Sequence, residues 1–388
     1  MTSRLAVVRG VERINFTELG MYAALRNEGF DPELLCSKRS RVTEAQAGMP
    51  IRRLALPLVA SLLAPTLVGG YLIGRVSPYR YYHQYLRGFH RAVQSVDILC
   101  PVDLGHPTSY QSVMERKFGK KVVVQCWDNI PFNWPNDRPI RHHYEAVLDG
   151  ADHFLALTDD SRRALRAMGV REERISRVNI GVDTEFWRPG PAASPPRSPV
   201  ELLFVGRLDW AKGIHTVIEA LDLVTAPVRL TIVGAGIQEE RLRWLIESRN
   251  RRGNPAAARS VQFLRPRFGE ELRRLRQSSD VQLIPSIPTP QWREQLNQSM
   301  LEGMACGLPP IASATGAIPE AVSDRDTGLL VPPDSPADWA RAIDYLAGRT
   351  EDRHRMGERS RERVVERYSL VQQGHALATV LRTRVLGT

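Results

Sequence analysis

The sequence predicts an α/β protein built from two doubly wound, Rossmann-like domains, each with its own parallel sheet. The chain has 388 residues, which is too long for a single hydrophobic core. Short apolar runs alternate with helical patterns in both halves, as in parallel sheets covered by helices on both faces. A proline-rich segment separates the halves. Ligands of such folds bind beyond the carboxyl ends of the strands, so we expect a central cleft between the two domains.

Apolar runs of strand length mark the expected strands of each sheet. In the first half they cover residues 4–9, 31–36, 97–100, 121–126, 152–157 and 175–179. In the second half they cover residues 200–206, 228–233, 260–264, 281–285, 309–312 and 328–331. Helical patterns fit between nearly every pair of strands. Beyond the last strand, helices are expected near 336–348 and 351–367, and a tail runs from 369 to 388.

The segment 189–199 is the expected linker between the domains. It contains five prolines in eleven residues, and so many prolines exclude a helix or a central strand. The predicted boundaries are therefore a first domain at 1–188, the linker at 189–199 and a second domain at 200–365. We expect the remaining residues, 366–388, to form a C-terminal helix that packs back on the first domain.

Composition indicates an ordinary globular protein of the reduced cytosol. Hydrophobic residues make up 43% of the chain and charged residues 25%, which argues against a disordered chain. The four cysteines are scattered without a CxxC pair, so neither a disulfide framework nor a zinc site is indicated. The N-terminus reads as a first strand and lacks the apolar core of a signal peptide. The sequence therefore predicts a cytoplasmic protein.

The net charge of +10 is concentrated in one part of the first domain. Residues 38–91 hold nine basic side chains and one acid. Within them, residues 54–74 carry no charge, and 77–87 combine tyrosines with arginines. Prolines and glycines interrupt the apolar run, and a membrane span here would divide the first domain. Two readings stay open for this run, a core helix or a hydrophobic edge seated on a bilayer.

Positive charge next to apolar sequence predicts contact with an anionic membrane surface through residues 52–91, on the inner face of the cell membrane. Nucleic acid is not an expected partner, because the chain has no nucleic-acid motif and the basic cluster adjoins apolar sequence.

The turn after the first strand of the second domain carries two cations between two glycines. It reads Gly206-Arg207-Leu208-Asp209-Trp210-Ala211-Lys212-Gly213. An arginine supplies a bidentate fork and a lysine a mobile point charge, which together suit a diphosphate. Two unrelated surface cations are the alternative, but their placement at a strand-to-helix turn favours a binding site.

Two acids, Glu294 and Glu302, lie eight residues apart around the expected start of a short helix. A helix N-terminus suits a phosphate, and carboxylates accept hydrogen bonds from hydroxyl groups. A solvated helix face is the alternative reading. Against it, three prolines at 285, 288 and 290 indicate an extended loop that delivers Glu294. The arrangement is what a nucleotide-sugar requires.

Three other patterns are weak signals. The run Val233-Gly234-Ala235-Gly236 lacks the third glycine of a dinucleotide fingerprint and reads as a tight turn. Asp324-Arg325-Asp326 matches a D-x-D metal signature but lies in a late loop, so we expect a solvated turn. His106, His142 and His143 lack metal-ligand spacing, which favours surface or packing roles. We therefore expect no obligatory metal and no cofactor.

With these motifs the chain resembles a retaining glycosyltransferase of family 4, which has the GT-B fold. The resemblance is carried by the E-x7-E motif at Glu294 and Glu302 and by residues 205–213. Residues 180–189 resemble the usual end of the first domain, and 326–331 resemble the loop that follows the donor site. The resemblance is strong over about 150–345.

The resemblance implies roles for particular residues. Arg207 and Lys212 would neutralise the donor diphosphate, Glu294 would bind the donor sugar, and Glu302 would accept hydrogen bonds from the ribose. Further donor-binding candidates are Gly206 and Gly10 in the first turns of the two domains, the amides of Leu296, Asn297 and Gln298, and Arg265, near which we expect base selection. Asp128 is the candidate for a catalytic role that many members give to a histidine.

The expected function is therefore transfer of a hexose, with retention of configuration, from a nucleotide diphosphate sugar to an acceptor hydroxyl. A glycan or a lipid-linked molecule is the expected acceptor, bound by the first domain. Two alternatives remain at this point, a nucleotide-sugar 2-epimerase on the same fold and a non-catalytic, membrane-associated protein.

Overall fold

The protein is described by a computed structural model that covers residues 2–10, 14, 16–56, 85–133, 138–190, 198–251 and 259–388. The chain divides into two compact units. Unit 1 contains Met1–Gly181 together with Leu370–Thr388, and unit 2 contains Val182–Ser369. The chain therefore passes from one unit to the other at two places, after Gly181 and after Ser369.

Unit 1 is built on a parallel sheet with the strand order β3-β2-β1-β4-β5-β6-β7. The strands are β1 (Ser3–Arg9), β2 (Phe30–Ser37), β3 (Ile51–Leu54), β4 (Ile98–Cys100), β5 (Lys121–Cys126), β6 (His153–Ala156) and β7 (Ile175–Arg177). The order reverses between β1 and β4, which makes that point of the sheet the topological switch where ligands bind in open α/β folds.

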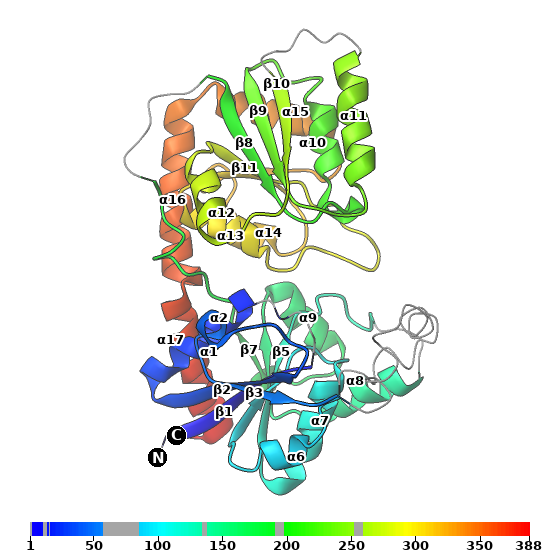
Figure 1. Ribbon diagram of the computed structural model, residues 1–388, viewed down its shortest axis with the longest axis vertical. Helices are drawn as coiled ribbons and strands as arrows, with labels where there is room; N and C mark the ends of the chain where they lie inside the picture. Colours follow the sequence, from blue (N-terminus) through cyan, green and yellow to red (C-terminus); the bar gives the residue numbers. More distant parts are fainter. Residues whose placement is uncertain are drawn as a thin grey trace. The chain divides into compact units, whose positions relative to one another are not determined.

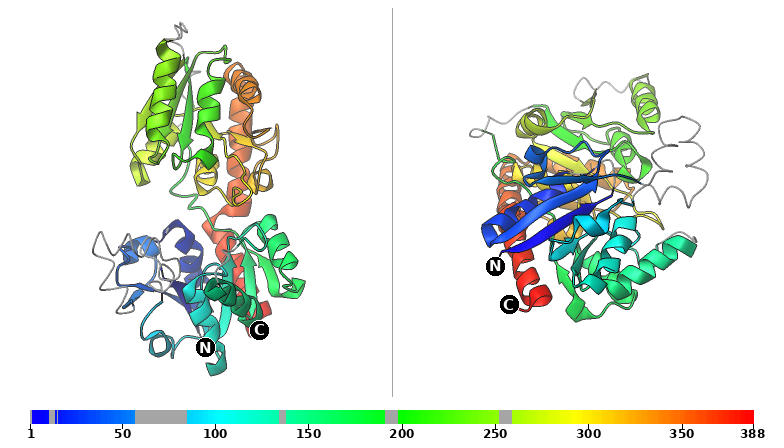
Figure 2. Two further views of the ribbon diagram at one scale, coloured as in Figure 1. Left: turned by 90° about the vertical axis from the view of Figure 1, so that its right-hand side faces the viewer. Right: turned by 60° about the horizontal axis from the view of Figure 1, so that its bottom comes forward.

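Alternate residues of the unit 1 strands pack against helices on opposite faces of the sheet (Figures 1 and 2). Ala6 and Val8 of β1 face one hydrophobic core, whereas Leu5 and Val7 face the other. Among the residues that the structure describes, the α-helices of this unit are α1 (Gly20–Ala24), α2 (Glu44–Ala47), α6 (Phe89–Ala92), α7 (Pro107–Met114), α8 (Arg138–Gly150), α9 (Asp159–Ala167) and α17 (Leu370–Val380).

The last helix of the chain, α17, completes the core of unit 1. Its buried Leu377 and Ala378 share a cluster with Leu5 and Val7, and Leu381 follows in the same cluster. A Cβ added to Gly374 would lie 2.6 Å from the Cβ of Ala24 on α1, so the glycine permits close approach of the two helices. The residues Leu370–Thr388 thus belong to unit 1.

Unit 2 has a parallel sheet with the strand order β10-β9-β8-β11-β12-β13. The strands are β8 (Val200–Val205), β9 (Val228–Val233), β10 (Arg259–Leu264), β11 (Val281–Ile284), β12 (Pro310–Ser313) and β13 (Leu329–Val331). Here the order reverses between β8 and β11, so the topological switch of this sheet lies between those two strands.

The main core of unit 2 lies on one face of its sheet, where Leu202 and Phe204 pack with buried residues of α10 and α15. Leu203 faces the opposite side and packs with Leu308. Helices lie on both faces (Figure 1). They are α10 (Ile214–Ala220), α11 (Glu239–Arg251), α12 (Gly269–Gln277), α13 (Gln298–Ala305), α14 (Ile318–Ala321), α15 (Pro336–Ala347) and α16 (Thr350–Tyr368).

The structure confirms two Rossmann-like parallel sheets and all twelve expected strands, and it adds β3. Sequence analysis missed β3 because its residues Ile51-Arg52-Arg53-Leu54 read as the basic edge of an apolar run. In the fold both arginines make contacts inside unit 1. Arg52 pairs with Glu33 at 2.9 Å and donates to a backbone carbonyl of α6, and Arg53 donates to the carbonyl of Val42. Their apolar neighbour, residues 57–84, lies outside the described residues.

The division between the units falls at Gly181 and Val182 rather than after Arg188. Residues 182–188 belong to unit 2 because its helices bind them. Arg273 donates to the carbonyl of Phe186, and Arg361 donates to the carbonyl of Trp187. Residues 191–197 of the expected linker lie outside the described residues. None of the helices in the described part of the chain has the length and apolar character needed to cross a membrane.

Candidate donor and acceptor sites

The expected donor-binding residues of unit 2 gather at its topological switch. Lys212 follows β8, and Glu294 follows β11, the two strands between which the strand order reverses. Both residues lie beyond the carboxyl ends of their strands, Lys212 at the end of a short 3-10 helix (Trp210–Lys212) and Glu294 in a loop, at the edge where parallel sheets bind ligands. The two most diagnostic residues of the sequence thus come together although 82 positions separate them.

Close backbone contacts fix the loops that carry these side chains. Gly213 has a φ of +65°, and an added Cβ would lie 1.8 Å from the carbonyl oxygen of Pro285. The amide of Ile287 donates to the carbonyl of Ala211 at 2.8 Å. The turn after β8 is therefore pressed against the loop after β11, and only glycine fits at the point of closest approach.

Lys212 and Glu294 form a largely buried ion pair. The Lys212 Nζ lies 3.0 Å from Oε1 and 2.7 Å from Oε2 of Glu294. The two side chains are 16% and 6% exposed, so both charges have lost most of their water. Lys212 also lies over the ring of Trp292, with Nζ 4.9 Å from the centroid. The Lys212 ammonium is therefore held between the ends of β8 and β11 rather than in solvent.

The Glu294 carboxylate receives further donors from its own loop and strand end. The hydroxyl of Ser286 and the side-chain amide of Asn297 both donate to Oε2, the latter at 3.2 Å. Its backbone is fixed as well, because Ala317 donates to the Glu294 carbonyl at 3.0 Å. Beside it, Gly316 has a φ of +54°, and an added Cβ would meet that carbonyl oxygen at 2.1 Å. Glu294 is thus positioned by three separate loops.

Arg207 leaves the same turn with its side chain 70% exposed. Its Nη2 lies 3.1 Å from Asp209, whose other carboxyl oxygen accepts from the Lys212 amide. Gly206 at the base of the turn donates to the carbonyl of Val233. An added Cβ on Gly234 would meet the Gly206 carbonyl oxygen at 2.0 Å. The backbone after β9 therefore approaches the turn after β8 so closely that only glycine fits at 234.

The N-terminus of α13 opens beside Glu294. Asn297 caps the helix, its Oδ1 accepting from the Met300 amide at 2.9 Å. Leu296, the residue before the cap, is buried. Gln298 is the first residue of the helix. The first amides of an α-helix have no partner within it and can bind an anion. Figure 1 shows α12, α13 and α14 together at one end of unit 2.

Glu302 lies one turn into α13 and is 7% exposed. Its Oε2 accepts from Nη2 of Arg276 on α12 at 2.9 Å. Burial raises the pKa of Glu302, and the Arg276 guanidinium opposes that rise. The sequence analysis did not single out Arg276, because α12 carries several arginines and nothing in the sequence distinguishes the buried one.

The remaining candidates of unit 2 are more peripheral. Arg265 is exposed at the carboxyl end of β10, the edge strand. Asp324-Arg325-Asp326 forms a turn, with Asp324 accepting from the Leu330 amide and Asp326 facing Arg359 at 3.4 Å. Within the described residues, no group of three or more histidine, cysteine or acidic side chains is arranged to hold a metal ion.

Asp128 and Gly10 lie at the corresponding edge of unit 1. Gly10 is buried directly after β1, and Asp128 follows β5 by two residues. Between these strands, β4 is followed by Asp103, a non-glycine residue with a φ of +55°. The Asp103 carboxyl accepts from the Trp127 amide at 2.8 Å, which fixes it beside Asp128. The spacing of the sequence gave no sign of this second aspartate.

Burial sets the protonation of these acids. It raises the pKa of Asp128 to about 6. It also raises the pKa of Asp103 well above its ordinary value, with the Asp128 carboxylate as the next cause. Arg9 of β1 is the neighbouring cation and is only 1% exposed. Its guanidinium donates to the Gln125 side chain and lies 3.7 Å from the Glu18 carboxylate. The two aspartates therefore retain protons at a pH where exposed carboxyls are ionised.

We predict that Asp128→Asn raises the stability of unit 1 at pH 8 and has little effect near pH 4. The folded pKa of about 6 lies above the unfolded value, so folding binds protons and the wild type loses stability as pH rises from 4 through 6. An asparagine removes that loss, on the order of 2 kcal/mol. The measurement is Tm by calorimetry at both pH values. Asp149→Asn on the exposed face of α8 serves as the control, and parallel pH curves for Asp128→Asn and the wild type would refute the assignment.

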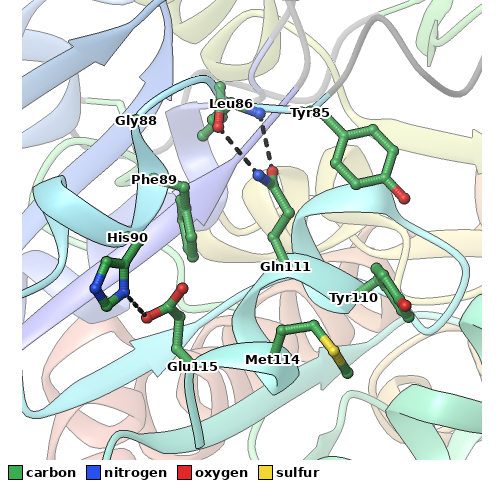
Figure 3. A pocket seen from close by; sticks show the side chains of 9 residues that line it. All are labelled: Tyr85, Leu86, Gly88, Phe89, His90, Tyr110, Gln111, Met114 and Glu115. Carbon is green, nitrogen blue, oxygen red and sulfur yellow. Dashed lines mark hydrogen bonds and ion pairs between the residues drawn. The ribbon is translucent and has the colours of Figure 1, made fainter. Parts of the chain in front are cut away.

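A cavity of about 350 Å³ on unit 1 lies apart from these groups, along α7, the start of α6 and the residues before α6 (Figure 3). Its lining residues are Tyr85, Leu86, Gly88, Phe89, His90, Tyr110, Gln111, Met114 and Glu115. The polar side chains in it are already engaged, since Gln111 bonds the backbone of Leu86 in both directions and His90 lies 2.8 Å from Glu115. It does not include Asp103 or Asp128.

Comparison with known proteins agrees with this geometry. Residues 192–363 match the family described as glycosyl transferases group 1, and residues 17–181 match the glycosyl transferase 4-like domain. Together the two matches cover both units. Each unit thus matches a family model for a glycosyltransferase domain, and the fold is the GT-B fold.

Two relatives of this chain come from bacteria. The D-inositol 3-phosphate glycosyltransferase of Corynebacterium urealyticum is 30% identical over 256 residues, which covers 62% of this chain and 58% of the relative. WcaL of Salmonella typhimurium, a protein assigned to colanic acid biosynthesis, is 30% identical over 246 residues, covering 62% and 59%. The chain thus spans about three fifths of the length of these relatives.

A solved structure shares the fold over nearly the whole chain. The Anabaena protein Alr3699/HepE, in complex with UDP, superposes with a TM-score of 0.76. The match covers 98% of this chain and 100% of that one at 17% identity. At such low identity the similarity establishes the fold.

Proposed function

We propose that this protein is a retaining hexosyltransferase that uses a nucleotide diphosphate sugar as its donor. The observation that carries the proposal is the Lys212–Glu294 pair at the topological switch of unit 2, beside the N-terminus of α13. Solved structures of the same fold hold UDP and UDP-glucose, which supports a nucleotide-sugar donor here.

The charges of this site suit the breaking of a sugar–diphosphate bond. The leaving group is a diphosphate that gains negative charge as the bond breaks, so fixed cations and helix amides stabilise the transition state. Lys212 and Arg207 supply the cations, and the first amides of α13 supply the helix end. Glu294 offers carboxylate oxygens to sugar hydroxyls, and Glu302 offers them to the ribose.

Lys212 neutralises Glu294 in the structure. We infer that an incoming diphosphate competes for this ammonium, because a lysine is a flexible point charge with three donors. As Lys212 turns toward the phosphate, the Glu294 carboxylate regains acceptor capacity for the sugar. The ion pair thus balances the charges of Lys212 and Glu294 until the diphosphate pairs with the lysine and the sugar hydroxyls bind the carboxylate.

Retention is proposed to follow from attack on the same face that the diphosphate leaves, with a phosphate oxygen accepting the proton of the acceptor hydroxyl. This route needs no nucleophilic side chain and no metal. Asp128 at the carboxyl edge of unit 1 is the proposed partner on the acceptor side, since a carboxyl with a pKa of about 6 can donate or accept a hydrogen bond near neutrality.

A thermal-shift screen against UDP-, GDP- and ADP-sugars tests the donor and finds its base. We expect one series to raise Tm, because a ligand at a hundred times its Kd adds about 2.7 kcal/mol. Incubation with that donor alone then separates transferase from epimerase, since an epimerase changes the sugar without an acceptor. Absence of any shift, or of any change in the donor with a range of acceptors, would refute the proposal.

We further propose that the acceptor is a glycan or a lipid-linked molecule at an anionic membrane surface, contacted through residues 52–91. The sequence supports this through the basic side chains that surround an uncharged, apolar run. Arg87 and Arg91 of this region are exposed. We expect the protein to sediment with anionic vesicles and to be released by high salt. Equal recovery in the supernatant with neutral and with anionic vesicles would contradict the membrane proposal alone.

A further inference from the structure

Among the described residues of unit 2, Arg276 is the most buried charged side chain. Arg276 of α12 is 1% exposed, and its guanidinium lies over the ring of Trp187 at 5.0 Å. The guanidinium reaches across to α13, where Nη1 donates to the Ser299 carbonyl at 2.7 Å. Nη2 donates to the Ser299 hydroxyl at 3.1 Å and to Glu302 at 2.9 Å. One fork thus spans the first turn of α13.

We propose that Arg276 is a positioning residue that presents the Glu302 carboxylate, in its ionised form, to the ribose hydroxyls of a bound nucleotide. The inference rests on the proposed function, because Glu302 can serve a ribose only if unit 2 binds a nucleoside diphosphate. It adds a residue that touches no substrate but sets the orientation and the charge of one that does.

The geometry leaves the carboxylate partly free. Oε2 is occupied by Arg276, and the Gln298 side chain supplies one more hydrogen bond to the group. A carboxylate has about four acceptor positions, so two such donors leave capacity for two adjacent hydroxyls. The Glu302 side chain keeps 9% of its surface exposed. Because the fork also bonds Ser299, the guanidinium is fixed, and the carboxylate cannot rotate away without losing its bond to Arg276.

Burial is unfavourable for both members of the pair. It lowers the pKa of Arg276 and raises that of Glu302, and in each case it outweighs the opposing effect of the partner. Buried ion pairs of this kind seldom add net stability. The other buried arginine–carboxylate pair of unit 2 differs, since Asp222, the partner of Arg249, is 36% exposed. A need to keep Glu302 ionised in an apolar setting accounts for the full burial of Arg276.

Ribose discrimination is the property that this arrangement controls. Hydrogen bonds to a charged acceptor are about twice as strong as neutral ones. Without the guanidinium, a carboxyl at this depth takes up a proton and loses its fixed orientation. The nucleotide then still has its diphosphate held by Arg207 and Lys212, but the hydroxyls of its ribose contribute little to binding.

The test compares UDP, GDP and ADP with their 2′,3′-dideoxy forms by calorimetry. For the base that binds, we expect the wild type to prefer the ribose form by at least about tenfold. In Arg276→Met the preference should fall below about threefold. Arg276→Lys, which keeps the charge but loses the fork, should lie between the two and guards against a methionine variant that does not fold. Arg249→Met is the matched control and should keep the full preference.

The outcomes separate the two proposals. A tenfold preference retained in folded Arg276→Met, or a full wild-type preference in Arg276→Lys, would overturn the inference, because a merely structural arginine lowers Tm without changing the ratio. A wild type that binds none of the three diphosphates contradicts the proposed function instead. A wild type that binds a diphosphate without regard to its ribose removes the role of Glu302, and the role of Arg276 with it.

Discussion

Lys212→Ala should reduce turnover of the nucleotide-sugar by about a thousandfold or more while the protein stays folded. The reason is that Lys212 holds the ammonium at the topological switch, where the diphosphate charge develops. Its removal also leaves Glu294, which is 5% exposed, without its cation. The assay measures release of nucleoside diphosphate from the donor, which reports transfer and slow hydrolysis alike. Wild-type turnover in this variant would count decisively against the proposed site.

The chain offers both a control and a second readout for this prediction. Lys121→Ala removes an exposed lysine of unit 1 that faces Asp152 at 3.7 Å, and it should leave turnover unchanged. Lys212 is moreover the single lysine in the sequence of Val182–Ser369. A lysine-selective reagent therefore labels one position in that part of the chain. Donor binding should protect it, which mass spectrometry of the digested protein can measure.

Gly213→Ala should destabilise unit 2 by about 3 kcal/mol or more. Two effects combine at this residue. Its φ of +65° disfavours any side chain, and a Cβ would lie 1.8 Å from the Pro285 carbonyl oxygen. Because backbone atoms cannot move aside like the end of a side chain, the turn after β8 must separate from the loop after β11. Lys212 and Glu294 would then lose their common position, and Tm and donor binding should fall together.

Gly269→Ala provides the comparison for that variant. Gly269 has a φ of +53° in the same unit, but an added Cβ would meet nothing within 4 Å. The substitution should therefore lower the free energy of unfolding only by the strain of a left-handed backbone, about 1 kcal/mol. Equal losses of Tm in the two variants would show that the contact with Pro285 is not what demands glycine at 213.

The sequence predicted most of the fold because its signals are local. Parallel strands buried on both faces appear as short apolar runs, and helices leave their own period, so twelve strands could be placed. The failure at β3 has a physical cause. This edge strand carries Arg52 and Arg53, whose partners Glu33 and Val42 come from elsewhere in the unit, and no apolar alternation marks it.

The candidate site was predictable where one residue type suits one task at a fixed place in the fold. The strand-end turn with Lys212 and the acid at Glu294 are such cases, and the fold brings them together. Arg276 and Asp103 were not predictable. Their significance comes from burial and from neighbours distant in sequence, such as Glu302 for Arg276 and the Trp127 amide for Asp103, and neither leaves a pattern of spacing.

The place of α17 in unit 1 has a consequence for biosynthesis. Unit 2 is one continuous stretch of chain, whereas unit 1 lacks Leu377 and Leu381 of its core until the whole of unit 2 and the residues after Ser369 have been made. Domains generally fold as units during synthesis. Unit 1 therefore cannot complete its folding until unit 2, which follows most of it in the chain, has been made. The nascent first half, with its apolar surface still uncovered, is the stage at which this protein most needs protection by chaperones.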